Sequence, residues 1–156
     1  MIRELFEHVE NSRDILLDAT QKLDEKSFLD RQKGMSSIRD LLVHLMDAED
    51  YWIGSVILGE KRQKFLPDKY EDVANLKANW EIIRGRTRKL VSDMSTELLS
   101  GQVTVQWEVA REREEARRVD IGTVLLHLLT HELRHHGQVC LLMRQEGCEP
   151  PCLDLF

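Results

Sequence analysis

Four stretches of the chain carry apolar residues at every third or fourth position, the period of a helix with one buried face. They run from Ile2 to Leu23, from Ser37 to about Gly59, from Val73 to Met94 and from Ile121 to about Glu146. Ser37 and Asp40 have the capping-box spacing at the start of the second helix, and Gly147 is a natural stop after the last one. The pattern predicts an all-α protein built as a four-helix bundle.

The segment between the third and fourth helices has a different pattern. Val103, Val105, Trp107 and Val109 alternate with polar residues, which is the period of a half-buried strand. The run from Arg111 to Arg118 is nearly balanced in charge, so it either pairs back on that strand or forms a solvated connection. We therefore expect a short hairpin or an irregular loop over 103–118, followed by Asp120 as the cap of the last helix.

The last helix contains the run His-Glu-Leu-Arg-His-His-Gly-Gln from His131 to Gln138. Two histidines four residues apart project from one face of a helix and can bind a single metal ion. The predicted core seam of this helix is Ile121, Val124, Leu128, His131, His135, Gln138 and Leu142. Because an unpaired buried polar group costs about 1 to 3 kcal/mol, both imidazoles need partners there. A bound cation is one solution, and core carboxylates or carbonyls are another.

The letters H-E-x-x-H also match the zinc peptidase signature, in which Glu132 would be the general base. Gln138 and Leu141 stand where a metzincin has glycine and histidine, and only a short tail follows Gly147. A peptidase is therefore the least favoured interpretation. A third ligand must come from upstream, and His44 in the second helix is a better candidate than His8, which lies off the seam of the first helix.

Two segments carry a resemblance to a known family. They are Ile38-Arg-Asp-Leu-Leu-Val-His-Leu-Met-Asp-Ala-Glu-Asp-Tyr-Trp52 and Leu126-His-Leu-Leu-Thr-His-Glu-Leu-Arg-His-His-Gly-Gln138. With the order and length of the helices, they make nearly the whole chain resemble the DinB/YfiT-like metalloenzyme superfamily. The resemblance implies a four-helix bundle, often a homodimer, with one divalent metal ion per chain, zinc or nickel, bound by His44, His131 and His135. The family often has arginine where this chain has His136, and the Arg111 to Arg118 run is unusual for it.

Three further residues lie close to these ligands in the sequence. Glu132 is compatible with a catalytic base, with a group that orients a ligand, or with a surface charge. Asp47, one turn after His44, either binds the second nitrogen of that imidazole or belongs to a solvated face. His127, one turn before His131, is expected to support the site or to be a paired core histidine, and not to be a ligand.

Composition limits the partners and the location. The 156 residues suit one domain over 1–156. A net charge of -6 repels phosphate backbones, so we expect no nucleic-acid partner. No stretch approaches the roughly 18 apolar residues of a membrane span, and the N-terminus lacks a basic, apolar leader, so we expect no membrane contact and a cytoplasmic protein. The chain has an odd number of cysteines, which are Cys140, Cys148 and Cys152. We expect them to be reduced thiols.

The resemblance also implies a reaction class, because related proteins include metal-dependent thiol S-transferases and a mycothiol-dependent isomerase. On this hypothesis the protein joins a small-molecule thiol to an electrophile. The alternative is a metal-binding, stress-related or accessory protein without turnover, in which the ion mainly ties the second and fourth helices together. The two hypotheses differ at the fourth coordination position of the metal, which is open in an enzyme and closed in a structural site.

Overall fold

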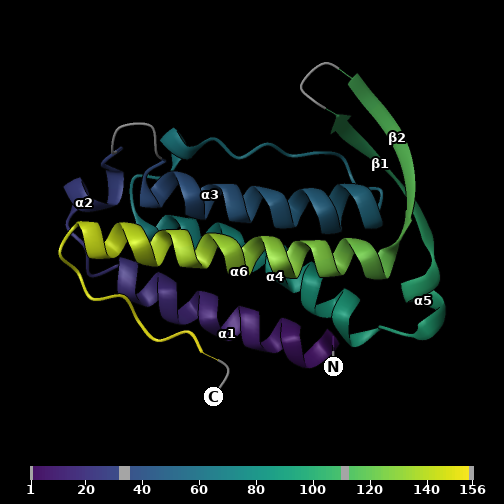
Figure 1. Ribbon diagram of the computed structural model, residues 1–156, viewed down its shortest axis with the longest axis horizontal. Coiled ribbons are helices and arrows are strands. Elements are labelled where there is room, and N and C mark those ends of the chain that lie inside the picture. The colour runs from purple at the N-terminus through teal and green to yellow at the C-terminus, as the bar shows by residue number, and fades with distance from the viewer. Residues whose placement is uncertain (1, 32–35, 110–112, 155–156) are drawn as a thin grey trace.

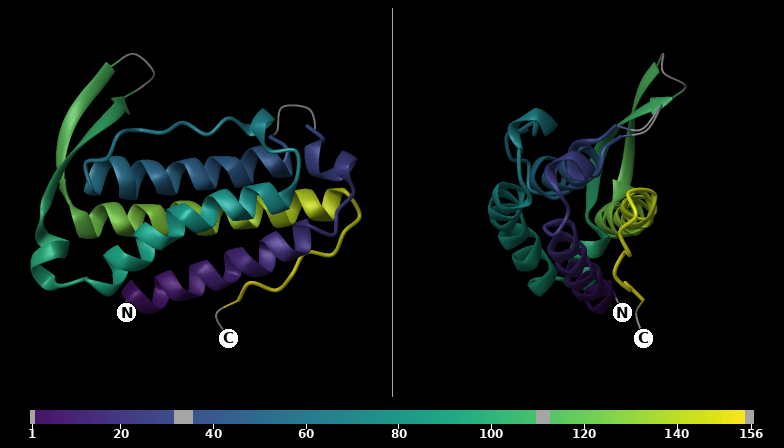
Figure 2. Two further views of the ribbon diagram at one scale, coloured as in Figure 1. Left: turned by 180° about the vertical axis from the view of Figure 1, so that it is seen from behind. Right: turned by 90° about the vertical axis from the view of Figure 1, so that its left-hand side faces the viewer.

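The computed structural model describes residues 2–31, 36–109 and 113–154 (Figure 1). Its long helices are α1 (Ile2–Thr20), α3 (Ile38–Glu49), α4 (Val73–Ser92) and α6 (Ile121–Gln145). The end-on view in Figure 2 shows them grouped around a common centre. This arrangement confirms the predicted all-α bundle. None of the helices in the described residues is long and apolar enough to cross a membrane.

The predicted helix ends are confirmed by their hydrogen bonds. Ser37 Oγ accepts from the backbone N–H of Asp40 at 3.1 Å, and the Asp40 carboxylate accepts from the N–H of Ser37, so the capping box is complete. Asp120 caps α6 by accepting from the N–H of Thr123 at 2.6 Å. Gly147 has a φ of 77°, a conformation that favours glycine and ends this helix.

The second predicted helix changes its winding halfway along. After α3 the chain continues as a π-helix, η1 (Asp50–Ile57), and Gly59 follows at a φ of 69°. Three short helices carried no periodic signal that predicted them. They are α2 (Glu25–Leu29), the 3-10 helix η2 (Pro67–Lys69) and α5 (Thr96–Ser100).

The segment before α6 forms the hairpin and not the irregular loop. Strands β1 (Gln102–Val109) and β2 (Arg113–Asp120) pair antiparallel, with Val105 opposite Arg117 and Val103 opposite Val119. The hairpin stands at the end of the bundle where α6 begins (Figure 1). Val103, near its base, packs against an apolar cluster that includes Ile121, Leu125 and Leu128 of α6.

The apolar core is divided into two clusters by buried polar residues. One cluster includes Leu16, Leu42, Trp80, Val139 and Met143. The other includes Ile53, Leu90, Ile121, Leu125 and Leu128. Along each long helix, a buried polar residue lies between the two clusters: Arg13 on α1, Glu49 on α3, Thr87 on α4 and Glu132 on α6. We call these four residues the polar layer.

Hydrogen bonds join the polar layer across all four helices. Arg13 donates through Nε and Nη2 to both carboxylate oxygens of Glu132, and its Nη1 lies 2.9 Å from Glu49 Oε2. Glu49 also accepts from Trp80 Nε1 at 2.6 Å and from the Thr87 hydroxyl at 2.5 Å. The Arg13 guanidinium lies 4.5 Å from the centre of the Trp80 ring. The layer therefore fixes how the helices face one another.

Candidate metal centre

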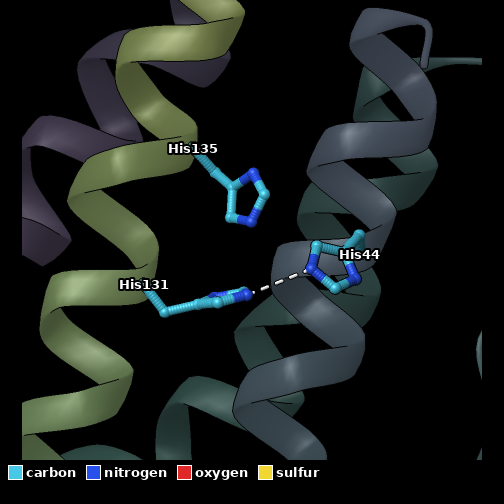
Figure 3. Close-up of side chains that lie close together, drawn as sticks. All are labelled: His44, His131 and His135. Carbon is cyan, nitrogen blue, oxygen red and sulfur yellow. Dashed lines mark hydrogen bonds between the residues drawn. The ribbon is translucent and has the colours of Figure 1, made fainter. Parts of the chain in front are cut away.

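Three imidazoles from two helices converge beside the polar layer. His44 comes from α3, and His131 and His135 come from successive turns of α6 (Figure 3). Nε2 of His44 lies 3.1 Å from Nε2 of His131, and one ring nitrogen from each of the three lies within 4.8 Å of the others. The structure thus brings together the three residues predicted as metal ligands. Among the described residues, no other group of three histidine, cysteine or acidic side chains meets this distance.

The burial of these histidines corrects the predicted seam of α6. His44 is exposed, and His131 and His135 are only partly buried. The core positions are taken by Glu132 and His136, with 3% and 2% of their surface exposed. The predicted seam is correct at Ile121, Val124, Leu128 and Leu142, which are buried, and wrong at His131, His135 and Gln138. Arg13 neutralises Glu132 and so allows a carboxylate to face the core there.

The three imidazoles are held in their neutral form. Burial, followed by the proximity of His135 and His44, lowers the pKa of His131 to about 4. Burial is also the main cause that lowers the pKa of His44 and of His135. Neutral imidazole is the form that binds a metal ion, since the ligand needs a free lone pair. The donor set therefore fits a divalent ion.

Gln138 sets the orientation of one of these rings. Its side-chain oxygen hydrogen-bonds Nδ1 of His135, so that Nδ1 carries the proton and Nε2 keeps its lone pair. The apolar pattern of the sequence places Gln138 on the predicted core seam of the last helix but assigns it no part in the metal site. Nδ1 of His131 is buried and has no hydrogen-bond partner among the residues described, so this ring is held by its neighbours at 4.4 Å (His135) and 5.9 Å (His127) between centroids.

Comparison with known proteins identifies the family of this chain. The sequence model of the DinB family matches residues 1–156. The chain belongs to the DinB family. The crystal structure of a DinB-like protein from Bacillus cereus ATCC 10987 is similar, with a TM-score of 0.69 over 93% of this chain and 89% of that one, at 16% identity. That similarity supports the fold alone. No curated protein sequence matches the chain.

In this DinB protein Glu132 does not face the three histidines. Burial alone would raise the pKa of its carboxyl group, but Arg13 and His136 lower it to about 2. A carboxylate with both oxygens held by a buried guanidinium is a poor proton acceptor, and it is not a surface charge either. Sequence reasoning missed Arg13 and Glu49. The available signal was a charged residue at a core position. Arg13 lies between Val9 and Leu16 on α1, and Glu49 lies between Leu45 on α3 and Ile53 on η1.

Asp47 and His127 also have definite places. Asp47 accepts from Arg62 Nη2 at 2.6 Å and from the backbone N–H of Phe65 at 3.0 Å, so it ties the segment after η1 to α3 and makes no hydrogen bond to His44. His127 lies one turn before the cluster, with its ring centre 5.0 Å from that of Trp52. It is partly buried and does not belong to the group of three.

Proposed function

We propose that His44, His131 and His135 bind one divalent ion per chain, zinc or nickel, and that this DinB protein is a metal-dependent enzyme of the thiol S-transferase type. The observation that carries the proposal is the convergence of three neutral imidazole nitrogens from α3 and α6 within 4.8 Å. Imidazole suits zinc and nickel among the available metals. Three neutral ligands leave the ion its full charge and one open position.

The surrounding residues have separate tasks in such a reaction. When bound, the ion would lower the pKa of a thiol at the open position. Gln138 fixes the ring of His135, and the exposure of His44 leaves that side accessible to substrates. Because Glu132 is held by Arg13, the thiol proton passes to solvent. The sulfur then forms its bond to an electrophilic carbon while the leaving group departs with its electron pair.

The alternative function is a non-catalytic, stress-related or accessory protein in which the ion joins α3 to α6. One observation supports this alternative: the histidine cluster connects two long helices, so an ion bound there would link them. The exposure of His44 favours the enzyme, since a structural site is closed to solvent. We also propose a homodimer, which rests on the family resemblance. Sedimentation as a single chain of 18.3 kDa would contradict it.

Replacement of His44 by alanine tests the metal site. The wild type should hold one divalent ion per chain. If the ion bridges α3 and α6, His44→Ala should lower metal affinity by more than the roughly 10- to 100-fold that loss of a supporting residue causes. A chelator should lower the melting temperature of the wild type but hardly that of the variant, because an ion that binds only the folded state stabilises it. His8→Ala, on α1 and outside the cluster, is the control.

Full metal occupancy and an unchanged chelator response in His44→Ala would show that the third ligand lies elsewhere. Turnover is tested separately, with a set of small thiols and 1-chloro-2,4-dinitrobenzene as a model electrophile. The enzyme should accelerate conjugation, and chelator should abolish the acceleration. A protein that binds the ion through His44 but accelerates no conjugation would favour the accessory function.

A further inference from the structure

A recess of about 230 Å³ lies beside the three histidines, between η1, the start of α6 and the base of the hairpin. Its walls are mostly aromatic and aliphatic: Trp52, Val105, Val119, Val124 and His127, with Thr123 at the helix. The recess is larger than the roughly 150 Å³ cavity that accommodates benzene. It is smaller than the roughly 300 to 1,000 Å³ of sites for drug-sized ligands. One ring or one short branched chain fits such a volume.

Two aromatic side chains connect the recess to the histidine cluster. The rings of Trp52 and His127 meet edge to face with centroids 5.0 Å apart, and His127 lies 5.9 Å from His131 between centroids. His127 is thus both a wall of the recess and a neighbour of a proposed ligand. A group held against His127 would lie next to the proposed metal position.

Arg117 gives the recess a single positive charge. It pairs with Val105 across the hairpin, and Val119 lies two residues further along the same strand, so these side chains share one face of the sheet. The other two residues of that face that line the recess, Val105 and Val119, are aliphatic. Among the side chains that the structure describes, none forms an ion pair with Arg117. Arg117 is exposed, and a charge on a strand edge can protect that edge from pairing with another chain. Beside an apolar recess, the guanidinium also suits the recognition of an anion.

We propose that this recess binds the second substrate, a small carboxylic acid with one compact apolar group, whose carboxylate contacts Arg117. The apolar group would lie between Trp52 and Val124, and the electrophilic carbon would face the histidine cluster. This inference rests on the proposed function, which supplies the metal and the thiol. It adds the chemical class of the electrophile and the residues that select it.

Phenylacetate and phenylacetamide test the proposal, because they share a shape and differ in charge. We expect phenylacetate to bind with a dissociation constant on the order of 1 mM, as suits a fragment of this size. It should shift the amide resonances of Thr123, Val124 and His127 in the NMR spectrum of the zinc-loaded protein. The neutral amide should bind more weakly by up to roughly fivefold, which corresponds to the roughly 1 kcal/mol upper value for an exposed charge pair.

Two variants, with one control, separate the effect of the charge on Arg117 from the effect of the shape of the recess. Arg117→Gln should remove the preference for phenylacetate, whereas Arg118→Gln, on the opposite face of the same strand, should keep it. Thr123→Phe should fill the recess and weaken both probes. Thr123 is exposed, and its hydrogen bond to Asp120 is donated by the backbone N–H and not by the side chain. This variant should therefore fold normally. An unchanged preference in Arg117→Gln, or wild-type binding of both probes by Thr123→Phe, would overturn the proposal.

The same titration in the presence of chelator distinguishes this inference from the proposed function. Binding that persists without metal and depends on Arg117 supports the recess, even if no ion ever occupies the histidines. Binding that requires the metal and is unaffected by Thr123→Phe means that the carboxylate binds the ion, which overturns the recess but not the metal site. In the cobalt-loaded protein the ring protons of phenylacetate should broaden. No broadening would refute the placement beside the cluster.

Discussion

Replacing Arg13 by methionine is the sharpest test of the polar layer. The guanidinium is 4% exposed and contacts carboxylates from two other helices, Glu132 on α6 and Glu49 on α3. Burial alone would lower its pKa, but these two carboxylates raise it above the usual value. Methionine keeps an apolar stem of similar length but removes every one of these contacts.

The two carboxylates would be affected unequally. Glu49 keeps its hydrogen bonds from Trp80 and Thr87. Glu132 loses both of its hydrogen bonds from Arg13, and its remaining polar neighbour is His136, whose Nε2 lies 3.3 Å from Oε1. Breaking a buried pair by removing one partner typically costs about 3 to 5 kcal/mol. We expect Arg13→Met to lose about that much stability, which corresponds to a melting temperature lower by roughly 6 to 20 °C.

Urea unfolding followed by circular dichroism, with chelator present throughout, measures this loss without a contribution from metal. The control is Arg88→Met on α4, because Arg88 is exposed and pairs with Glu10 and Glu81 at the surface. It should cost at most about 1 kcal/mol. Adding Glu132→Gln to Arg13→Met should restore part of the loss, since it removes the unpaired charge. A loss in Arg13→Met no larger than in Arg88→Met would refute the reasoning.

Two further predictions concern stability. Gly85→Ala, in the interior of α4 with no atom within 4 Å of the added Cβ, should stabilise the protein by about 0.5 to 1 kcal/mol in urea unfolding. Gly54→Ala should give a smaller gain or a loss, because its Cβ would lie 2.9 Å from Arg86 Nη1. Asp14 accepts from Arg84 at 2.6 and 2.9 Å, and these bonds hold its pKa below 3.8. Asp14→Asn should therefore lose up to about 1 kcal/mol at neutral pH. Because the folded pKa is the lower one, that difference should persist down to pH 3.8 and vanish as the pH falls through the folded pKa. A difference that widens in acid would contradict this assignment.

The sequence predicted the parts of the fold that depend on local patterns. The capping box of Ser37, the cap at Asp120 and the alternation from Val103 onward each involve residues a few positions apart, and each is found in the structure. The π-helix η1 was not predictable in this way. Its apolar spacing is compatible with an ordinary helix, and the wider winding depends on contacts with other elements.

The residues of the candidate site were predictable from the sequence, but the burial of their side chains was not. His131 and His135 are four apart, which fixes their common face, and His44 was chosen over His8 because His8 lies off the seam of the first helix. The resemblance implies the same three ligands. The inward position of Glu132 could not be read from the helix alone, since Val124, Leu125, Leu128 and Leu129 before it are all apolar and all buried. It depends on Arg13, which lies 119 positions away and pairs with Glu132.

The inward position of Glu132 gives the letters H-E-x-x-H a different physical meaning from the one they have in a peptidase. Successive residues on a helix point about 100° apart, so His131 and Glu132 face different neighbours. His131 turns toward His44 on α3, and Glu132 turns inward to Arg13 on α1. The same turn of α6 therefore carries His131 of the three-histidine cluster on one face and the ion-paired Glu132 on the inward face. Since Glu49 ties α3 to the same arginine, the buried pairs hold the two histidine-bearing helices at a fixed separation before any ion binds.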